Sequence, residues 1–250
     1  MIDRRRLLAG TGAAVLAAAA PLSARAVGAP LRLASVRYGS LSWVIATIRA
    51  LELDKKAGLS FDVVEVASNQ AGPVALLAGG ADVIVSDWTW AMRQRSLGEK
   101  LKFAPYSSAL GSLVVPADSA IQDIAGLEGK VLGVAGSAID KSWLLLRAYS
   151  NRALGRGKAG FARPTFGAAP LLAEEIRSGR IDAVLNFWTY AARLTGSGFR
   201  EILTVSEIMK RLGIDPVPAL VGFIWKEEYE AANGRDLATL LRIVDEANTV

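Results

Sequence analysis

Short apolar runs alternate with longer amphipathic segments along the chain from residue 31. Runs at 31–36, 61–66 and 83–85 have the length of strands, and the last two are rich in β-branched residues. Around them, segments 41–56 and 89–97 carry apolar residues at helical spacing. Strands that alternate with helices in this way are typical of a mostly parallel sheet covered on both faces. The pattern therefore predicts an α/β fold.

The same order of elements begins again after Pro116. We predict further strands at 102–106, 112–115, 131–134, 164–166, 183–187 and 220–225, and helices at 120–125, 137–150, 170–178 and 236–246. The restart suggests that two similar units follow one another along the chain.

One segment is echoed one hundred residues later. The sequence GGADVIVSDWTWA at 79–91 returns as GRIDAVLNFWTYA at 179–191, with Gly, Asp, Trp, Thr and Ala at equal offsets. Chance supplies part of this likeness, because Gly-x-x-Asp before an apolar strand is a common connection from helix to strand. The shared Trp-Thr-aromatic-Ala ending favours two similarly built lobes over coincidence.

The N-terminus has the three parts of a secretory signal peptide. Arginines at 4–6 precede an apolar stretch at 7–22, and Ala-Arg-Ala at 24–26 forms a small-x-small cleavage site. The paired arginines also suit the twin-arginine export route. An uncleaved membrane anchor is the alternative, but the stretch is interrupted by glycine and proline and is shorter than the ~20 residues a span needs. We therefore expect a periplasmic protein that loses residues 1–26.

Composition narrows the possible functions. Residues 1–26 hold four arginines and one aspartate, so their removal takes the formal net charge from +5 to +2. A nearly neutral protein gives no electrostatic reason to expect binding to nucleic acid. The chain has no cysteine and no histidine, which removes disulfides, the usual zinc ligands, thiol nucleophiles and imidazole bases. We expect no catalytic residue, no metal and no cofactor.

Polar and aromatic residues gather where strands lead into helices. Ligands of open parallel sheets bind at these corners, outside the C-terminal ends of the strands, where helix N-termini present free N–H groups. Any single Ser, Asn or Asp there is explained more simply as a helix N-cap, but the repeated tryptophan neighbours favour a binding role for the set. The candidate ligand-binding residues are Ser40, Trp43, Asp87, Trp88, Ser137, Asn186 and Trp188.

Two tryptophans hold matching places in the echoed segments. Trp88 and Trp188 would stack on opposite faces of a planar ligand if both line one cleft; otherwise they pack in the core. Asp87 would meet a positively charged or N–H-bearing ligand, or serve as a cap. No corner collects a basic cluster, so a sulfonate or nitrate would rely on backbone N–H groups and hydroxyls.

Three motifs carry a resemblance to a known family. The segment LLAGGADV at 76–83 is similar to the helix–Gly-x-x-Asp segment of periplasmic binding proteins of the sulfonate, taurine, nitrate and thiamine-pyrimidine (NMT1/SsuA-like) type. LDKKAGL at 53–59 resembles the turn after their first helix, and DIAGLEGKVLGV at 123–134 resembles the stretch that opens their second lobe. The matches keep the family's order over residues 31–225.

The resemblance implies a two-lobed type II periplasmic binding protein fold, with mixed, mostly parallel sheets and two hinge crossings. Lobe one would comprise 31–108 and 223–250, and lobe two 109–222. Such proteins usually run further past the return strand, so the sequence is either truncated or short in this part.

The function implied is that of the substrate-binding component of an ABC importer. A monomer would capture a small planar, heterocyclic or sulfonate-like solute between its lobes and deliver it to a permease and ATPase complex. The alternatives are an enzyme on the same bilobal fold, such as a lyase or a biosynthetic enzyme, and a periplasmic ligand sensor.

The cleavage site gives a first testable prediction. The exported protein should begin at or near Val27 and should be a monomer, because the site at 24–26 precedes the first predicted strand and no docking helix follows it. Intact-mass measurement of the periplasmic form checks both points under native conditions. A mass that retains residues 1–26 would contradict cleavage.

Overall fold

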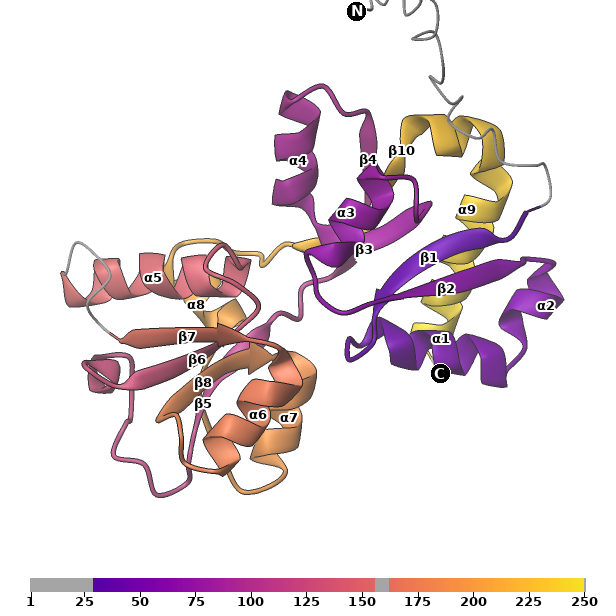
Figure 1. Cartoon of the computed structure of the whole chain (residues 1–250). Helices are drawn as coiled ribbons and strands as arrows, with labels where there is room; N and C mark the ends of the chain where they lie inside the picture. Colours follow the sequence, from indigo (N-terminus) through magenta and orange to yellow (C-terminus); the bar gives the residue numbers. More distant parts are fainter. Residues whose placement is uncertain (1–28, 156–161, 250) are drawn as a thin grey trace, which may run out of the picture. The chain divides into compact units, whose positions relative to one another are not determined.

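The computed structural model describes residues 29–155 and 162–249. Leu31–Val250 forms one compact unit that contains two five-stranded sheets (Figure 1). We call each sheet with its helices a lobe. The predicted signal peptide, 1–26, lies outside the described residues. Among the helices of the described part, none is long and apolar enough to cross a membrane.

Lobe one is built from the first third of the chain and from its end, which Figure 1 shows as yellow ribbon beside indigo. Its strands are β1 (Leu31–Val36), β2 (Phe61–Val66), β3 (Val83–Asp87), β4 (Leu101–Ser107) and β10 (Val221–Lys226), in the order β2-β1-β3-β10-β4. Its helices are α1 (Leu41–Ala50), α2 (Leu53–Ala57), α3 (Ala71–Leu77), α4 (Trp88–Ser96) and α9 (Glu227–Asn248). β1 pairs parallel with β2 and β3, whereas β10 pairs antiparallel with β3 and β4.

Apolar clusters cover both faces of this sheet. Successive residues of a strand point to opposite sides, so neighbours in the sequence belong to different clusters. Leu33 and Val83 belong to an apolar cluster shared with α1, α2 and α9. Ala34 and Ile84, the next residues along, belong to a second cluster shared with α3 and α4. A strand covered on both faces is mostly apolar, as the sequence pattern indicated.

Lobe two repeats this plan with the middle of the chain. Its strands are β5 (Gly111–Val115), β6 (Val131–Ala135), β7 (Arg163–Gly167), β8 (Ala183–Phe187) and β9 (Arg200–Thr204), in the order β7-β6-β8-β5-β9. Its helices are α5 (Lys141–Leu154), α6 (Ala169–Arg177), α7 (Trp188–Thr195) and α8 (Val205–Arg211). Apolar clusters again cover both faces, so that adjacent residues Leu113 and Val114 fall in different clusters.

The echoed segments form equivalent elements, because β3 and β8 are the central strands of their sheets and α4 and α7 follow them directly. Their aspartates also make the same contact. Asp82 Oδ2 accepts a hydrogen bond from the Arg32 amide at 2.7 Å, and Asp182 Oδ2 accepts one from the Val131 amide at 2.7 Å. Each carboxylate thus joins the start of the central strand to the strand beside it.

The chain crosses between the lobes twice. It leaves lobe one after β4, enters lobe two at β5, and returns from lobe two into β10. Val221 at the start of β10 pairs with Ser107 at the end of β4, so the two crossing segments meet in one strand pair. The predicted two-lobed α/β fold with mixed sheets and two crossings is therefore confirmed.

One predicted helix, 41–56, is two helices in the structure. α1 ends at Ala50 and α2 begins at Leu53, with Glu52 between them in the left-handed conformation at φ 54°. The Arg49 guanidinium bonds both the Asp54 carboxylate and the carbonyl oxygen of Phe61, the latter at 2.7 Å. These bonds join the end of α1 to α2 and to the start of β2. The apolar spacing continues through the break, so the sequence pattern did not reveal it.

Other helix bounds also differ from the predicted ones. α5 begins at Lys141 and not at 137, because Asp140 caps it by accepting a hydrogen bond from the Ser142 amide at 2.8 Å. α9 begins at Glu227 and not at 236, with a kink at Asn233 that divides it. In place of a helix at 120–125, the structure has a single 3-10 turn at Ala125–Leu127.

The aspartate contacts predict a matched pair of stability effects. Asp182→Ala should lower the free energy of unfolding by about 1–3 kcal/mol, because it leaves the Val131 amide without its partner. Asp182→Asn should cost less, because the amide oxygen still accepts that bond. Chemical denaturation of the mature protein measures both changes. The exposed Asp118→Ala serves as control, and an equal loss in that variant would contradict the prediction.

Candidate functional site

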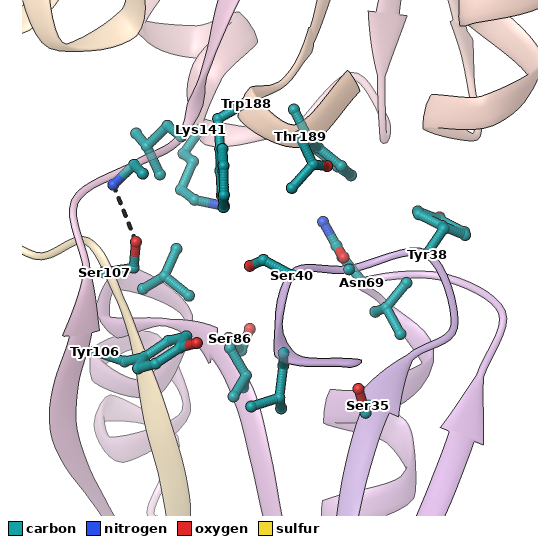
Figure 2. Close-up of a pocket in the computed structure, with 18 of the residues that line it drawn as sticks. Ser35, Tyr38, Ser40, Asn69, Ser86, Tyr106, Ser107, Lys141, Trp188 and Thr189 are labelled. Atoms are coloured by element: carbon teal, nitrogen blue, oxygen red, sulfur yellow. Dashed lines mark hydrogen bonds between the residues drawn. The ribbon is translucent and has the colours of Figure 1, made fainter. Parts of the chain in front are cut away.

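A cavity of about 130 Å³ is lined by residues of both lobes. Lobe one contributes the ends of its parallel strands and the segments that follow them, including Ser35, Ser40, Asn69 and Ser86. Lobe two contributes the first residues of α5 and α7. In Figure 2, Lys141, Trp188 and Thr189 extend from lobe two toward the hydroxyl groups of lobe one. The cavity lies where open α/β sheets bind their ligands, at the C-terminal ends of parallel strands.

The lining combines hydroxyl groups with one positive charge. The hydroxyl-bearing residues are Ser35, Tyr38, Ser40, Ser86, Tyr106, Ser107, Ser142 and Thr189. Of the described residues that line the cavity, Lys141 alone carries a formal charge, and no carboxylate is among them. Nor does the described part of the chain contain three or more potential metal-binding side chains in one group. The lining is therefore suited to hydrogen bonding around a neutral or negatively charged solute.

The two tyrosines of the cavity are neutral donors at physiological pH. Burial and the neighbouring Tyr190 phenol raise the pKa of Tyr38. Burial also raises the pKa of Tyr106, although a hydrogen bond with Asn248 opposes this shift. A phenol whose pKa lies above its ordinary value keeps its proton, so both groups remain available to donate a hydrogen bond.

Aromatic and polar contacts join the lobes beside the cavity. Trp43 meets Trp188 edge-to-face, with ring centroids 5.7 Å apart and an interplanar angle of 85°. The Arg193 guanidinium lies 5.4 Å from the Trp43 ring centroid. A polar contact adds to these rings, since Gln70 Nε2 donates to Ser137 Oγ at 3.1 Å. Because Trp43 and Gln70 belong to lobe one and their partners to lobe two, these contacts hold the lobes together.

Four of the seven sequence-predicted residues lie at the cavity or at these contacts. Ser40 and Trp188 line the cavity, and the Ser40 side chain makes no capping hydrogen bond, so capping does not explain it. Trp43 and Ser137 do not line the cavity but join the lobes beside it.

The other three predicted residues have local structural roles. Asp87 caps α4 by accepting a hydrogen bond from the Trp90 amide at 2.8 Å. Asn186 is 2% exposed and bonds the Ala169 carbonyl oxygen at 3.0 Å. Trp88 lines a separate pocket between α4, β4 and β10. The ring that faces Trp188 is therefore Trp43 and not Trp88, and the expected pairing of the two echoed tryptophans across one cleft is replaced by this contact.

Several cavity residues were not among the predicted ones. The position of the Lys141 side chain depends on where α5 begins. Asp140 lies directly before Lys141 and is a preferred capping residue, so the sequence did contain a signal for this helix start. Tyr38 and Asn69 lie in the same kind of strand-to-helix corner as Ser40. Ser35 lies within a strand, where nothing in the sequence separates it from an ordinary core position.

Comparison with known proteins adds a family to this geometry. Residues 49–209 match the family model described as NMT1/THI5 like. The chain belongs to the NMT1/THI5-like family. This match spans more than half of the chain, and it includes parts of both lobes. The sequence has no significant match among curated proteins.

Solved structures of binding proteins share the fold of this NMT1/THI5-like protein. The periplasmic aliphatic sulphonate-binding protein SsuA from Escherichia coli is 21% identical, with a TM-score of 0.64, over 87% of this chain and 72% of that one. The alkanesulfonate-binding protein SsuA from Xanthomonas axonopodis pv. citri, bound to MOPS, is 18% identical, with a TM-score of 0.63, over 88% and 73%. A binding protein component of an ABC phosphonate transporter from Pseudomonas aeruginosa is 13% identical, with a TM-score of 0.61, over 84% and 72%.

The contact of Trp43 with lobe two predicts a conformational effect. Trp43→Ala should remove an aromatic interaction of about 1 kcal/mol, which shifts the balance between joined and separated lobes roughly fivefold toward separation. Small-angle X-ray scattering of the mature protein without solute should then give a larger radius of gyration. Trp88→Ala is the matched control, because Trp88 is a similarly exposed ring of lobe one outside these contacts. An unchanged radius for Trp43→Ala would contradict the assignment.

Proposed function

We propose that the protein is the periplasmic solute-binding component of an ABC importer and that it captures a small organic anion between its two lobes. The observation that carries this proposal is the cavity, which both lobes line at the ends of their strands with one cation and no carboxylate. A site of this composition favours negative charge.

Helix ends add to the charge of Lys141. α1, α5 and α7 all begin at the cavity, and each has at least eight residues. The N-terminus of a helix carries a partial positive charge and free N–H groups that bind anions. Enclosure between the lobes strengthens such hydrogen bonds, because the local dielectric constant is lower than in water. The Asp140 carboxylate already caps α5, whereas no side chain caps α1 or α7. The N-termini of α1 and α7 and the Lys141 ammonium group would therefore hold an anion without a cluster of arginines.

The organic part of the solute would lie on the apolar lining. Val85, Leu110 and Trp188 supply this surface, and the Tyr106 ring lies next to them. Trp188 is the one tryptophan among the described residues that line the cavity, so stacking of a flat heterocycle from both sides has less support than anion binding. The SsuA proteins named above are sulfonate-binding proteins, and the Pseudomonas aeruginosa protein is part of a phosphonate transporter, which supports the same ligand class.

A binding role has better support than an enzymatic one. Asp87, the one carboxylate among the predicted site residues, caps its own helix and does not line the cavity. The expected partners are a permease and an ATPase, and the expected location is the periplasm, to which residues 1–26 would direct the protein.

A ligand panel tests the proposed function. Alkanesulfonates, alkylphosphonates and carboxylates of two to four carbons should stabilise the mature protein against heat, whereas the matching alcohols should not. At one hundred times the dissociation constant, the stabilisation amounts to about 2.7 kcal/mol. A panel in which no anion stabilises the protein would argue against the assignment.

The charge at the cavity can be tested separately. Lys141→Gln should weaken binding of the best anion about tenfold or more, equivalent to about 1.4 kcal/mol, by isothermal titration calorimetry. The melting temperature without ligand should stay nearly unchanged, because no structural ion pair is lost. Lys210→Gln on the exposed side of α8 is the control. Equal affinity in wild type and Lys141→Gln would show that the anion lies elsewhere.

A further inference from the structure

One buried hydroxyl group at the cavity has no protein partner. Ser35 lines the cavity, is only 4% exposed, and its Oγ makes no hydrogen bond. Buried hydroxyl groups are normally bonded, because a hydroxyl withdrawn from water without a partner costs free energy. The only other buried side-chain oxygen or nitrogen without a bond in the described residues belongs to Asp54, which does not line the cavity.

The surroundings of Ser35 do not explain a hydroxyl at this position. On the same face of β1, Leu33 lies in the apolar cluster with α1 and α9, and Val85 and Tyr106 pack against that cluster. An alanine would complete this surface without leaving an unbonded oxygen. The hydroxyl is therefore a cost to the empty protein, and a group that enters the cavity would offset it.

We propose that Ser35 binds a polar group of the solute that is separate from its negative charge, so that the solute has two functional groups. This inference rests on the proposed function, because it takes the anion to lie at Lys141. Figure 2 shows Ser35 in lobe one and Lys141 in lobe two, on opposite sides of the cavity. An anion held at Lys141 would thus leave the Ser35 hydroxyl to a second group of the solute. The solute class is a short organic anion with a hydroxyl, amino or carbonyl group at its other end.

Ser35 would act as a specificity-determining residue. A serine hydroxyl both donates and accepts, so it satisfies any of these groups. A solute with a purely apolar end would leave Ser35 unbonded. Sites with a buried polar group reject analogues that lack the matching group more strongly than apolar pockets reject an added methylene. Ser35 thus selects for the second functional group, whereas Lys141 selects for charge.

Matched ligands separate this role from the proposed function. The probes are ω-hydroxyalkanesulfonates of two to four carbons, each compared with the unsubstituted alkanesulfonate in which a methyl group replaces the hydroxyl. Phosphonates or carboxylates take their place if that headgroup binds best in the panel. Titration calorimetry on the wild type should show a preference of about tenfold or more for the hydroxylated probe at one chain length.

Ser35→Ala should abolish this preference while it still binds the alkyl probe with wild-type or higher affinity. Its melting temperature without ligand should be unchanged or higher, since an unbonded hydroxyl is removed. Ser108→Ala, an exposed position outside the cavity lining, should keep the wild-type preference.

Three results would overturn the inference. If the alkyl probes bind the wild type as well as the hydroxylated probes at every length, Ser35 fails as a selector although the anion site stands. If Ser35→Ala keeps the preference, another residue reads the second group. If no probe of either series binds the wild type with any headgroup, the proposed function itself fails.

Discussion

Two carboxylates, Asp82 and Asp182, fix the strand register on which the cavity depends. Each accepts the amide hydrogen of the strand beside it, so that the start of the central strand is aligned with its neighbour in both lobes. Register set at one end of a parallel pair determines which residues reach the other end, because a one-residue slip turns every side chain to the opposite face. Ser35 and Ser86 consequently line one cavity although fifty-one residues separate them.

The two echoed segments fold in the same way but have different roles at the cavity. The echoed segments place Asp87 and Phe187 at the same position before a helix, but only Asp87 has a side chain that caps its helix. Trp88 then lies in a pocket away from the cavity, and Trp188 lines the cavity itself. Lobe one supplies most of the hydroxyl groups, whereas lobe two supplies the ammonium group. Internal repetition therefore predicted the architecture and did not predict how the lobes divide the chemistry.

Features set by residues close together in the sequence were predicted, whereas features set by contacts between distant residues were missed. Buried strands such as Leu31–Val36 were predicted with their observed bounds, because apolar runs between turn residues are a local signal. The break at Glu52 was missed, because Arg49 causes it through bonds to residues further along the chain. Ser40 and Trp188 were found at helix starts, where ligand-binding groups are expected. Lys141 and Ser35 were missed, because their directions depend on a helix start and on the packing of a strand.

The pairing of Ser107 with Val221 bears on how the molecule moves. The Trp88 amide also donates to the carbonyl oxygen of Leu220 at 3.2 Å, which holds the returning segment against lobe one. Two crossing segments that are bonded to each other have fewer ways to move than two independent linkers. This pairing therefore restricts the motion of one lobe against the other. The lobes of the solute-free protein therefore have fewer relative positions to lose when a solute binds between them. The entropy lost on closure is smaller than for lobes joined by a single flexible linker.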